Sequence, residues 1–310
     1  MSSLQGRDFL SVNDFTPDEL LEILTFAQEL KIKQRTGQAA ALLPGKTLGM
    51  IFQKASTRTR VSFEAGMFQL GGYALYLSAA DMQIGRGEEI KDTARVLSRY
   101  LDGIMIRTYA HRDVEELAAY AEIPVINGLT DLLHPCQAMA DLLTILEQQG
   151  TLSGLKLAYL GDGNNMAHSL LLACSKLGIN VAVASPLGYQ PSAAIVADAQ
   201  ANAQKHGSTV TVTTEPAAAA ADADVLYTDV WASMGQEAEQ MSRAKIFKSY
   251  QLNNQLLAQA KSEAIVMHCL PAHRGEEISE EVLEGPQAVV FDQAENRLHV
   301  QKAIMAKLLS

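Results

Sequence analysis

The fold is decided by a strand that runs directly into a helix, in residues 47–70: TLGMIFQKASTRTRVSFEAGMFQL. Residues 47–52 are an apolar run of the kind found in strands buried on both faces, and residues 58–70 have the pattern of a helix. Outward from this pair, short apolar runs alternate with longer amphipathic segments through almost the whole chain. Strands separated by helices in this way indicate parallel sheets covered by helices on both faces.

The alternation forms two series, which are separated by the turn-like residues 149–151. The strands expected before this break cover residues 47–52, 73–77, 103–106 and 125–126. Those expected after it cover residues 155–160, 180–184, 209–212, 225–227, 265–267 and 288–291, and residues 294–309 are expected to form the last helix. We therefore predict an α/β protein of two domains, residues 1–150 and 151–292. Because ligands of such folds bind at the carboxyl ends of the strands, we expect the active site in the cleft between the domains.

Composition narrows the class of protein. The 310 residues suffice for two domains, and 48% hydrophobic with 19% charged residues is ordinary for a globular chain. The net charge of −10 argues against a nucleic acid or an anionic membrane as partner, because both require a basic face. No segment has the pattern of a signal peptide or the length to span a bilayer. The three cysteines are odd in number and far apart, which suits neither a disulfide framework nor a metal site, so we expect a cytoplasmic protein.

Residues 54–60 place polar groups after the first strand and at the start of a helix. A helix start exposes unpaired N–H groups and the positive end of the helix dipole. With the hydroxyls of Ser56, Thr57 and Thr59 and the guanidinium of Arg58, it makes a pocket for a phosphate. The motif lacks the glycines of a P-loop, so a nucleoside triphosphate is not the expected ligand. The alternative is an ordinary helix cap formed by Ser56 or Thr57, and the motif alone leaves both interpretations open.

Two further residues of the first series occupy similar positions. Arg107 follows the strand of residues 103–106, where site residues of α/β proteins belong, although a single arginine there is also common on a surface. His134 precedes a proline that suits the first turn of a helix. His134 can donate a hydrogen bond to a carbonyl oxygen, and Gln137 can accept one from an amide N–H.

In the second series, residues 161–165 (GDGNN) follow a strand and precede a helix. A dinucleotide-binding fingerprint would need a third glycine where Met166 stands, which argues against a dehydrogenase. Asn165 instead offers an amide to a carboxylate ligand. Asp229, which follows a later strand, can bind an ammonium group, and Ser233 can reach a polar head group.

Residues 268–275 (HCLPAHRG) follow the strand of residues 265–267. His268, Cys269 and His273 have a spacing that suggests zinc, but no fourth ligand is evident nearby. A nucleophilic Cys269 with a histidine base is a second interpretation, and it does not explain the phosphate pocket.

Taken together, these motifs resemble those of the aspartate and ornithine carbamoyltransferase family. Residues 56–60 (STRTR) and 134–137 (HPCQ) are similar to its carbamoyl phosphate signature. Residues 229–235 (DVWASMG) and 268–271 (HCLP) are similar to the motifs of its ornithine members. The resemblance covers nearly the whole chain and extends to residues 295–297 (ENR); residue 55, often proline in the family, is alanine here.

The resemblance implies a carbamoyl phosphate domain (1–150), on which a helix of residues 293–310 packs, and an ornithine domain (151–292). It assigns eleven residues to carbamoyl phosphate: Ser56, Thr57, Arg58, Thr59, Gln83, Arg107, His134, Gln137, Cys269, Leu270 and Arg297. It assigns four to ornithine: Asn165, Asp229, Ser233 and Met234. It also implies a homotrimer, or a multiple of trimers, in which Gln83 reaches into the site of the neighbouring subunit.

The implied reaction moves a carbamoyl group from carbamoyl phosphate to the δ-amino group of L-ornithine, giving L-citrulline and phosphate, in arginine metabolism. No metal or organic cofactor is expected. Four residues are the predicted catalytic ones: Arg107 and His134 would stabilise the oxyanion, and Asp229 and Cys269 would orient the amine. The alternatives are a carbamoyltransferase for aspartate, putrescine or an acylated ornithine, against which the later motifs argue, and a ligand-binding regulator without turnover.

Overall fold

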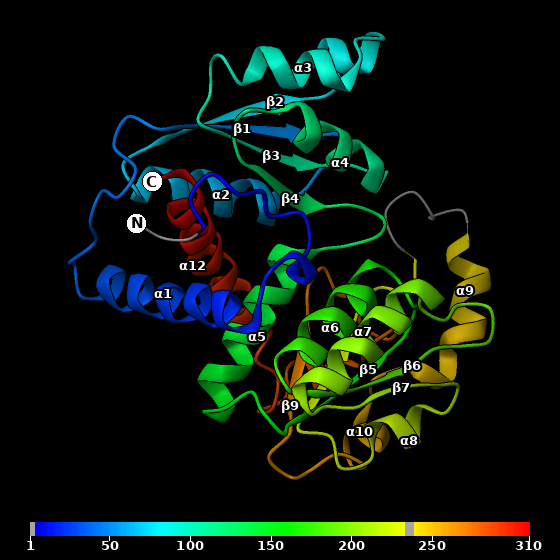
Figure 1. Cartoon of the computed structure of the whole chain (residues 1–310). Coiled ribbons are helices and arrows are strands. Elements are labelled where there is room, and N and C mark those ends of the chain that lie inside the picture. The colour runs from blue at the N-terminus through cyan, green and yellow to red at the C-terminus, as the bar shows by residue number, and fades with distance from the viewer. Residues whose placement is uncertain (1–3, 233–238) are drawn as a thin grey trace. The chain divides into compact units, whose positions relative to one another are not determined.

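The computed structural model describes residues 4–232 and 239–310, which fall into two compact units (Figure 1). Unit 1 comprises Met1–Ala140 and Glu295–Ser310, and unit 2 comprises Asp141–Ala294. The chain passes from unit 1 to unit 2 within helix α5 (Pro135–Gln149) and returns within helix α12 (Val290–Leu309). Unit 2 is therefore one continuous segment, whereas unit 1 is made of two.

Unit 1 is built, within the described residues, on a four-stranded parallel sheet in the order β2-β1-β3-β4. The strands are β1 (Thr47–Phe52), β2 (Tyr73–Ser78), β3 (Gly103–Arg107) and β4 (Val125–Leu129). Every residue of β3 and β4, and every residue of β1 after Thr47, is buried. β2 is an edge strand and is partly exposed along its length.

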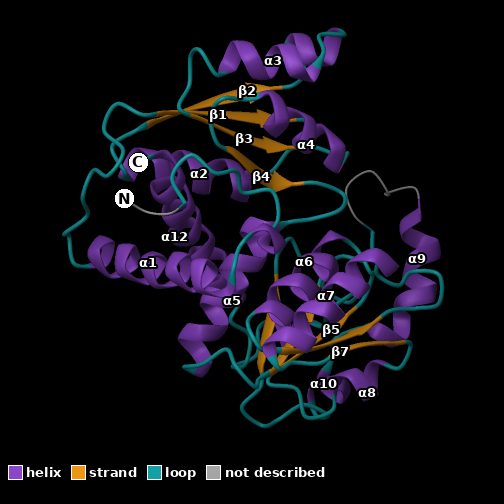
Figure 2. Ribbon diagram, in the orientation of Figure 1, coloured by secondary structure: helices purple, strands orange, loops and turns teal. Residues whose placement is uncertain are grey.

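Helices cover both faces of this sheet (Figure 2). The described helices of unit 1 include α1 (Pro17–Arg35), α2 (Thr57–Gln69), α3 (Ile90–Leu97), α4 (His111–Tyr120) and the C-terminal part of α12, with short 3-10 helices η1 (Val12–Asp14) and η2 (Gln83–Arg86). α3 and α4 share an apolar cluster with β1, β3 and β4. α2 and α12 lie on the other face and pack closely: a Cβ on Gly66 would lie 3.1 Å from Met305 and 3.2 Å from Lys302. α1 lies beside α12, where the Lys31 Nζ donates to the Asn296 Oδ1 at 2.7 Å.

Unit 2 holds, in the part of the chain described, a five-stranded parallel sheet in the order β7-β6-β5-β8-β9. The strands are β5 (Lys156–Leu160), β6 (Asn180–Ala184), β7 (Val210–Thr213), β8 (Val225–Thr228) and β9 (Ile265–His268). The helices are α6 (Asn165–Lys176), α7 (Ala193–His206), α8 (Pro216–Ala220), α9 (Gln240–Phe247), α10 (Asn254–Leu257) and α11 (Glu280–Leu283), with the 3-10 helix η4 (Lys248–Tyr250). α8, α10 and α11 share a buried cluster with the sheet, and α6 packs against α7.

The strand order gives each sheet one point at which the direction of winding reverses. In unit 1 the chain goes from β1 outward to β2 and then returns to β3 on the other side of β1. In unit 2 it goes from β5 outward to β6 and β7 and then returns to β8. Ligands of open α/β sheets bind beside such a point, outside the carboxyl ends of the strands. The favoured positions for ligand binding are therefore directly after β1 and β3 in unit 1 and directly after β5 and β8 in unit 2.

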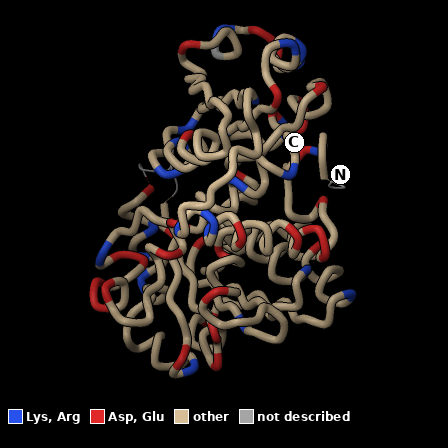
Figure 3. The backbone as a smooth tube through the Cα atoms, turned by 90° about the vertical axis from the view of Figure 1, so that its left-hand side faces the viewer, with Lys and Arg blue, Asp and Glu red and all other residues tan. Residues whose placement is uncertain are grey.

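The α/β fold predicted from the sequence, with two parallel sheets covered by helices, is confirmed. The nine strands expected up to residue 267 all form, and β4 is longer than expected. The predicted domain limits and the placement of the active site between the domains stay predictions. No helix in the described ranges has both the length and the apolar character needed to cross a membrane. Basic and acidic residues are interspersed in both units (Figure 3).

The strand expected over residues 288–291 is wrong. Ala288 forms only an isolated bridge with Val266, and α12 begins at Val290. The backbone N–H of Gln293 already donates to the Val289 carbonyl, as in a helix. A run of four apolar residues fits an edge strand as well as the first turn of a buried helix, so the pattern alone could not separate the two.

Candidate functional site

The predicted phosphate motif forms the turn between β1 and α2 in unit 1. Ser56 is the N-cap of α2, and its Oγ accepts a hydrogen bond from the Thr59 N–H at 3.2 Å. The helix-cap interpretation of Ser56 is therefore correct, and a cap at this position is compatible with a phosphate at the same helix start. Thr57 is exposed, Arg58 is half-buried and Thr59 is fully buried. The first turn of a 13-residue helix thus presents its N–H groups, a hydroxyl and a guanidinium together.

Side chains from three other parts of unit 1 are linked to Thr59 by hydrogen bonds, two of them directly and the third through Arg297. The Arg297 Nη2 of α12 donates to the Thr59 hydroxyl at 2.7 Å, and the Arg107 Nη1 at the end of β3 lies 3.5 Å from the same oxygen. The Arg297 Nη1 donates to the Gln137 Oε1 of α5 at 2.6 Å. All four of these side chains are buried. Residues predicted from separate motifs therefore surround one point.

His134 belongs to the same group of residues, just before α5. It is buried, and burial together with the positive charges of Arg297, Arg107 and Arg58, in that order, holds its pKa well below the usual value. The imidazole is therefore neutral and can serve as an uncharged hydrogen-bond donor. Three guanidinium groups near a neutral ring make this cluster of side chains strongly electropositive, which suits an anionic ligand.

Lys54 joins two of the turns that carry these residues, and it was not predicted from the sequence. It is buried, its ammonium group pairs with the Asp131 carboxylate, and it lies 4.3 Å from the centre of the Tyr109 ring. Asp131 stands in the loop that leads to His134, so the pair joins the turn after β1 to the turn before α5. A lysine at a buried turn is a usable signal, but its partner is 77 residues away and could not be identified from the pattern.

The second group of predicted residues lies in unit 2. Asp229 follows β8 and Cys269 follows β9, and the Cys269 thiol donates to the Asp229 Oδ1 at 3.0 Å. The other carboxylate oxygen of Asp229 accepts from the Asn164 Nδ2 at 2.9 Å. Asp229 is buried and Cys269 is partly exposed. A carboxylate and a thiol that share one hydrogen bond can both face an amine, and the predicted contact of these two side chains with the amine of ornithine stays a prediction.

Asn164, which was not predicted as a site residue, lies next to the predicted Asn165 at the start of α6. Asn164 is the N-cap of α6, and its Oδ1 accepts from the N–H groups of Met166 at 2.9 Å and Ala167 at 3.2 Å. Asn165 is the first residue of α6 and is half-buried. A cap asparagine before an apolar helix is a recognisable signal, but the sequence does not show that its amide reaches Asp229.

Arg243 and Asp162 form a buried ion pair that the sequence analysis also missed. The Arg243 Nη1 lies 2.8 Å from the Asp162 Oδ2 and 2.9 Å from the carbonyl oxygen of Trp231. Burial, opposed by Arg243, raises the pKa of Asp162 to about 6. The pair fixes the glycine-rich turn after β5 to the segment that begins after Asp229. The predicted contacts Ser233 and Met234 lie outside the described residues.

His268 supports the backbone of the Cys269 segment. Its Nδ1 accepts from the Leu270 N–H at 2.8 Å, so its Nε2 has the hydrogen and donates to the Glu277 Oε1 at 3.1 Å. Leu270 has a φ of 57°, a left-handed conformation that is unusual for leucine and that this hydrogen bond stabilises. Cys269 and Leu270 belong to unit 2, and their predicted contact with carbamoyl phosphate stays a prediction.

The zinc interpretation of this segment is not favoured by the hydrogen bonds. Ligand atoms of Asp229, His268 and Cys269 lie within 4.8 Å of one another, but both ring nitrogens of His268 are already engaged by protein groups. The third residue of the expected set, His273, groups instead with Glu276 and Glu277. Since the Cys269 thiol donates to a carboxylate, a thiolate–histidine pair is not supported either.

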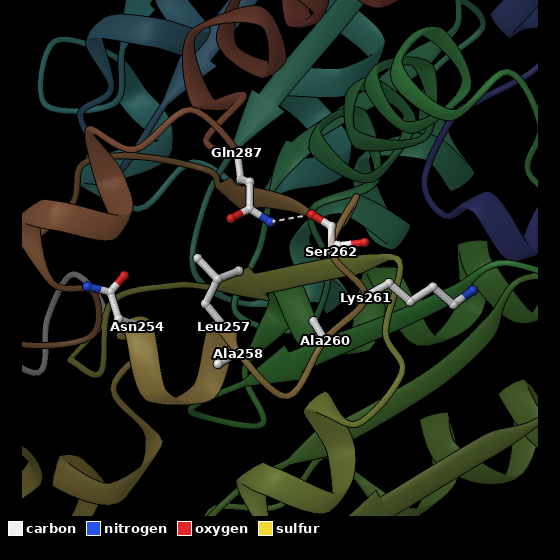
Figure 4. Close-up of a pocket in the computed structure, with 7 residues that line it drawn as sticks. All are labelled: Asn254, Leu257, Ala258, Ala260, Lys261, Ser262 and Gln287. Carbon is white, nitrogen blue, oxygen red and sulfur yellow. Dashed lines mark hydrogen bonds between the residues drawn. The ribbon is translucent and has the colours of Figure 1, made fainter.

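Gln83 lies at the start of η2, after the edge strand β2, and is exposed. Its predicted contact with a neighbouring subunit stays a prediction. A shallow pocket in unit 2 involves none of the predicted residues (Figure 4). It is lined by Asn254, Leu257, Ala258, Ala260, Lys261, Ser262 and Gln287. The residues from Ala258 to Ser262 precede β9, so the pocket lies near the amino end of that strand, away from Cys269.

Two protein-family models match almost the whole chain. One is described as the aspartate/ornithine carbamoyltransferase carbamoyl-P binding domain and matches residues 7–147. The other is described as the Asp/Orn binding domain of the same family and matches residues 153–308. The chain belongs to the aspartate/ornithine carbamoyltransferase family.

Individual members of the aspartate/ornithine carbamoyltransferase family are similar over their full length. The ornithine carbamoyltransferase of Anoxybacillus flavithermus is 60% identical over 306 residues, which cover 99% of this chain and 98% of that relative. That of Symbiobacterium thermophilum is 60% identical over 310 residues, which cover 100% of both chains. The solved structure of ornithine carbamoyltransferase from Pyrococcus furiosus is 56% identical, with a TM-score of 0.97, and covers 100% of this chain and 98% of that chain.

Membership in the aspartate/ornithine carbamoyltransferase family agrees with the two groups of side chains. The carbamoyl-P binding model includes Arg58, Arg107 and His134, and the Asp/Orn binding model includes Asp229 and Cys269. The family predicted from the four motifs is confirmed, and the dehydrogenase alternative is excluded.

Proposed function

We propose that the protein transfers the carbamoyl group of carbamoyl phosphate to the δ-amino group of L-ornithine, giving L-citrulline and phosphate, a reaction of arginine metabolism. One observation matters most: the buried guanidinium groups of Arg107 and Arg297 meet at the Thr59 hydroxyl, beside the N-terminus of α2. Such a cluster suits a small donor that has both a phosphate and a carbonyl group. The full-length identity to enzymes named ornithine carbamoyltransferase supports ornithine as the acceptor.

The phosphate group would lie at the start of α2. The proposed contacts are Ser56, Thr57, Arg58 and backbone N–H groups of the first helical turn, since a helix N-terminus favours a phosphate. As the bond to the carbamoyl carbon breaks, the departing phosphate gains negative charge, which Arg58 and the helix dipole would stabilise. Carbamoyl phosphate is already an activated donor, so the proposal includes no metal or organic cofactor.

The carbamoyl group would lie between Thr59, Arg107 and His134. Attack of the amine on the carbamoyl carbon places negative charge on its oxygen, which Arg107, His134 and the Thr59 hydroxyl would stabilise as fixed donors. Because His134 is held neutral, it can donate to this oxygen without adding a further charge to the pocket. The Gln137 Oε1 would accept from the carbamoyl N–H₂, and Arg297, which holds Gln137, would set its orientation.

Ornithine would bind at the carboxyl ends of β5, β8 and β9. The attacking δ-amino group must first lose a proton to solvent, because its pKa in water is about 10. The nitrogen loses a second proton after the attack, which the departing phosphate can accept. The Asp229 carboxylate and the Cys269 thiol are the proposed contacts of this group, and the 3.0 Å bond between them lets the pair adjust to the charge of the amine. Asn165, Ser233 and Met234 are the proposed contacts of the amino-acid end of ornithine.

We also propose a homotrimer in the cytoplasm. The edge strand β2 and the neighbouring α2 leave Phe68 and Tyr73 exposed at 79% and 66%, and Gln83 follows directly in η2. An exposed apolar edge of this kind is suited to contact with another copy of the chain. All three cysteines are free, and the proposed role of Cys269 needs its reduced form, which fits the reducing cytoplasm.

The decisive experiment is an assay of citrulline formation by the purified protein from carbamoyl phosphate and ornithine, with aspartate and putrescine as alternative acceptors in parallel. We expect turnover with ornithine and a specificity constant at least about a hundredfold lower for the other two, because an unmatched polar contact costs several kcal/mol. Turnover with aspartate or putrescine in preference to ornithine would overturn the acceptor. Carbamoyl phosphate binding without any turnover would favour the ligand-binding regulator.

A further inference from the structure

The backbone in front of Cys269 is held by a buried glutamine of α12. The Gln293 Oε1 accepts a hydrogen bond from the His268 N–H at 2.9 Å. The Gln293 Nε2 donates to the Asp141 Oδ1 at 2.7 Å and to the Tyr227 hydroxyl oxygen at 3.0 Å. Because the His268 N–H can only donate, the Gln293 amide oxygen must face it, which fixes the orientation of the amide. The oxygen and both N–H groups of the Gln293 amide are therefore hydrogen-bonded. All four residues belong to unit 2.

Asp141 is the common acceptor of this network. Its second oxygen accepts from the Tyr227 hydroxyl at 3.1 Å, and both side chains are fully buried. The pKa of Tyr227 is raised well above its usual value, first by burial and then by the charges of Asp141, Cys269 and Asp229. Tyr227 therefore keeps its proton and remains a donor. Asp141 thus binds β8 through Tyr227 and β9 through Gln293.

The two strands bound in this way are the ones that end in Asp229 and Cys269. β8 and β9 are parallel neighbours, with Tyr227 beside Met267 and Thr228 beside His268. The next residue on each strand is a member of the pair joined by the 3.0 Å hydrogen bond. A change in the position of either strand end would change the distance between thiol and carboxylate.

The position of Gln293 in the fold explains why a side chain performs this task. β9 is an edge strand, and segment 287–289 runs along its outer side, where the Val266 N–H donates to the Gln287 carbonyl at 2.8 Å. The chain then turns into α12 at Val290 and leaves the sheet. The next outward N–H of β9, that of His268, would lose its partner in a buried site at a cost of about 1–3 kcal/mol. The Gln293 side chain supplies the acceptor that a further strand would otherwise have provided for this N–H.

We propose that Gln293, held by Asp141 and Tyr227, is a positioning residue that sets the distance between the Cys269 thiol and the Asp229 carboxylate. The inference deepens the proposed function, on which its kinetic prediction rests. If Gln293 had a purely structural role, its substitution would change only the stability of the protein. If Gln293 is a positioning residue, its substitution also changes the reactivity of the Cys269 thiol. Cys269 can report this directly, because Cys136 and Cys174 are fully buried and burial raises the pKa of the Cys136 thiol to about 12.

The test is Gln293→Met, which keeps the length of the side chain and removes all three hydrogen bonds. Alkylation of Cys269 by iodoacetamide, followed by mass spectrometry between pH 6.5 and 9, measures the thiol. A thiol that donates to a carboxylate ionises less readily, so we expect alkylation at pH 7.5 to become about three- to tenfold faster in the variant. We expect kcat for citrulline formation to fall about tenfold or more, with a smaller change in the KM for carbamoyl phosphate.

Gln287→Met is the matched control. Gln287 also bonds to backbone in unit 2, in front of β9 and at the opposite end of the strand. It donates to the carbonyl oxygen of Ser262 (Figure 4) and to that of Ala264. We expect it to leave the alkylation profile and kcat within about twofold of the unsubstituted protein, because surface substitutions are usually small in effect. Tyr227→Phe, which removes one hydroxyl, should shift alkylation in the same direction by a smaller factor, and it serves if Gln293→Met does not fold.

Unchanged alkylation in both Gln293→Met and Tyr227→Phe would overturn the inference, and so would an equal shift in Gln287→Met. The alkylation measurement needs no substrate. If the unsubstituted protein made no citrulline, the proposed function would fail while the position of the thiol could still be tested.

Discussion

At the scale of single residues, the guanidinium groups of unit 1 are the strongest electrostatic feature that a bound phosphate would meet. Two unit charges about 4 Å apart interact with roughly 4 kcal/mol at an effective dielectric near 20, whereas a hydroxyl hydrogen bond is worth about 1 kcal/mol. Arg58 and Arg107 are therefore expected to matter more than Ser56.

The first prediction compares these residues in citrulline formation. We expect Arg58→Gly and Arg107→Gln to lower kcat/KM about a hundredfold or more, and Ser56→Ala about fivefold, as their contact energies imply. Arg60→Gly is the control, since Arg60 pairs with Glu64 at 3.0 Å and lies over the Tyr76 ring. Near-normal turnover of folded Arg58→Gly would contradict the phosphate assignment.

The second prediction concerns Cys269. Replacing the thiol by the smaller hydroxyl in Cys269→Ser keeps a donor but lengthens the contact with Asp229. We expect kcat to fall about tenfold, while the dissociation constant of carbamoyl phosphate, measured by calorimetry, changes less than about threefold. Unchanged kinetics would remove Cys269 from the proposed mechanism.

The third prediction follows from the lowered pKa of His134. In the unfolded chain this histidine binds a proton below about pH 6.5, whereas in the folded protein it stays neutral. The unfolded state therefore binds more protons below that pH, and stability falls as the pH falls, by at most about 1.4 kcal/mol per pH unit for one group. We expect His134→Gln to reduce this slope between pH 5 and 6.5 in urea titrations. An unchanged slope would show that His134 is protonated in the folded state.

At the scale of elements, the sequence was most informative where strands end. Each parallel strand exposes its carboxyl end at a known edge of the sheet, so Arg107 at the end of β3 and Asp229 after β8 could be predicted as site residues. Contacts between distant segments of the chain could not be predicted in this way. Lys54, Asn164 and Arg243 act through Asp131, Asp229 and Asp162, and no periodicity shows which carboxylate each of them meets.

The fourth prediction uses two helix caps of the same type. Asn164 caps α6 and also binds Asp229, whereas Asn253 caps α10 by accepting from the N–H groups of Gln255 and Leu256. Each substitution by alanine should lower the free energy of unfolding by about 1 kcal/mol. Only Asn164→Ala should raise the KM for ornithine, which steady-state kinetics would measure. An equal rise in Asn253→Ala would attribute the effect to stability alone.

At the scale of the whole molecule, the exposed apolar side chains of β2 and α2 are the proposed contact between subunits. The fifth prediction is that Phe68→Glu combined with Tyr73→Arg abolishes the proposed trimer, because charges buried in an interface lose their hydration. Light scattering coupled to gel filtration would measure the mass. Leu187→Glu, at a site in unit 2 that is 84% exposed, is the control. A trimer that survives the double substitution would place the interface elsewhere.

The discontinuity of unit 1 has a consequence for biosynthesis. A ribosome completes the 154 contiguous residues of unit 2 before it makes the helical turns after Ala294 that belong to unit 1. Nascent chains commonly fold from the N-terminus onward, one unit at a time. When unit 2 is complete, the group of basic side chains around Thr59, which includes Arg58, therefore still lacks Arg297. The nascent protein should therefore acquire its affinity for the carbamoyl donor last, after the acceptor half has formed.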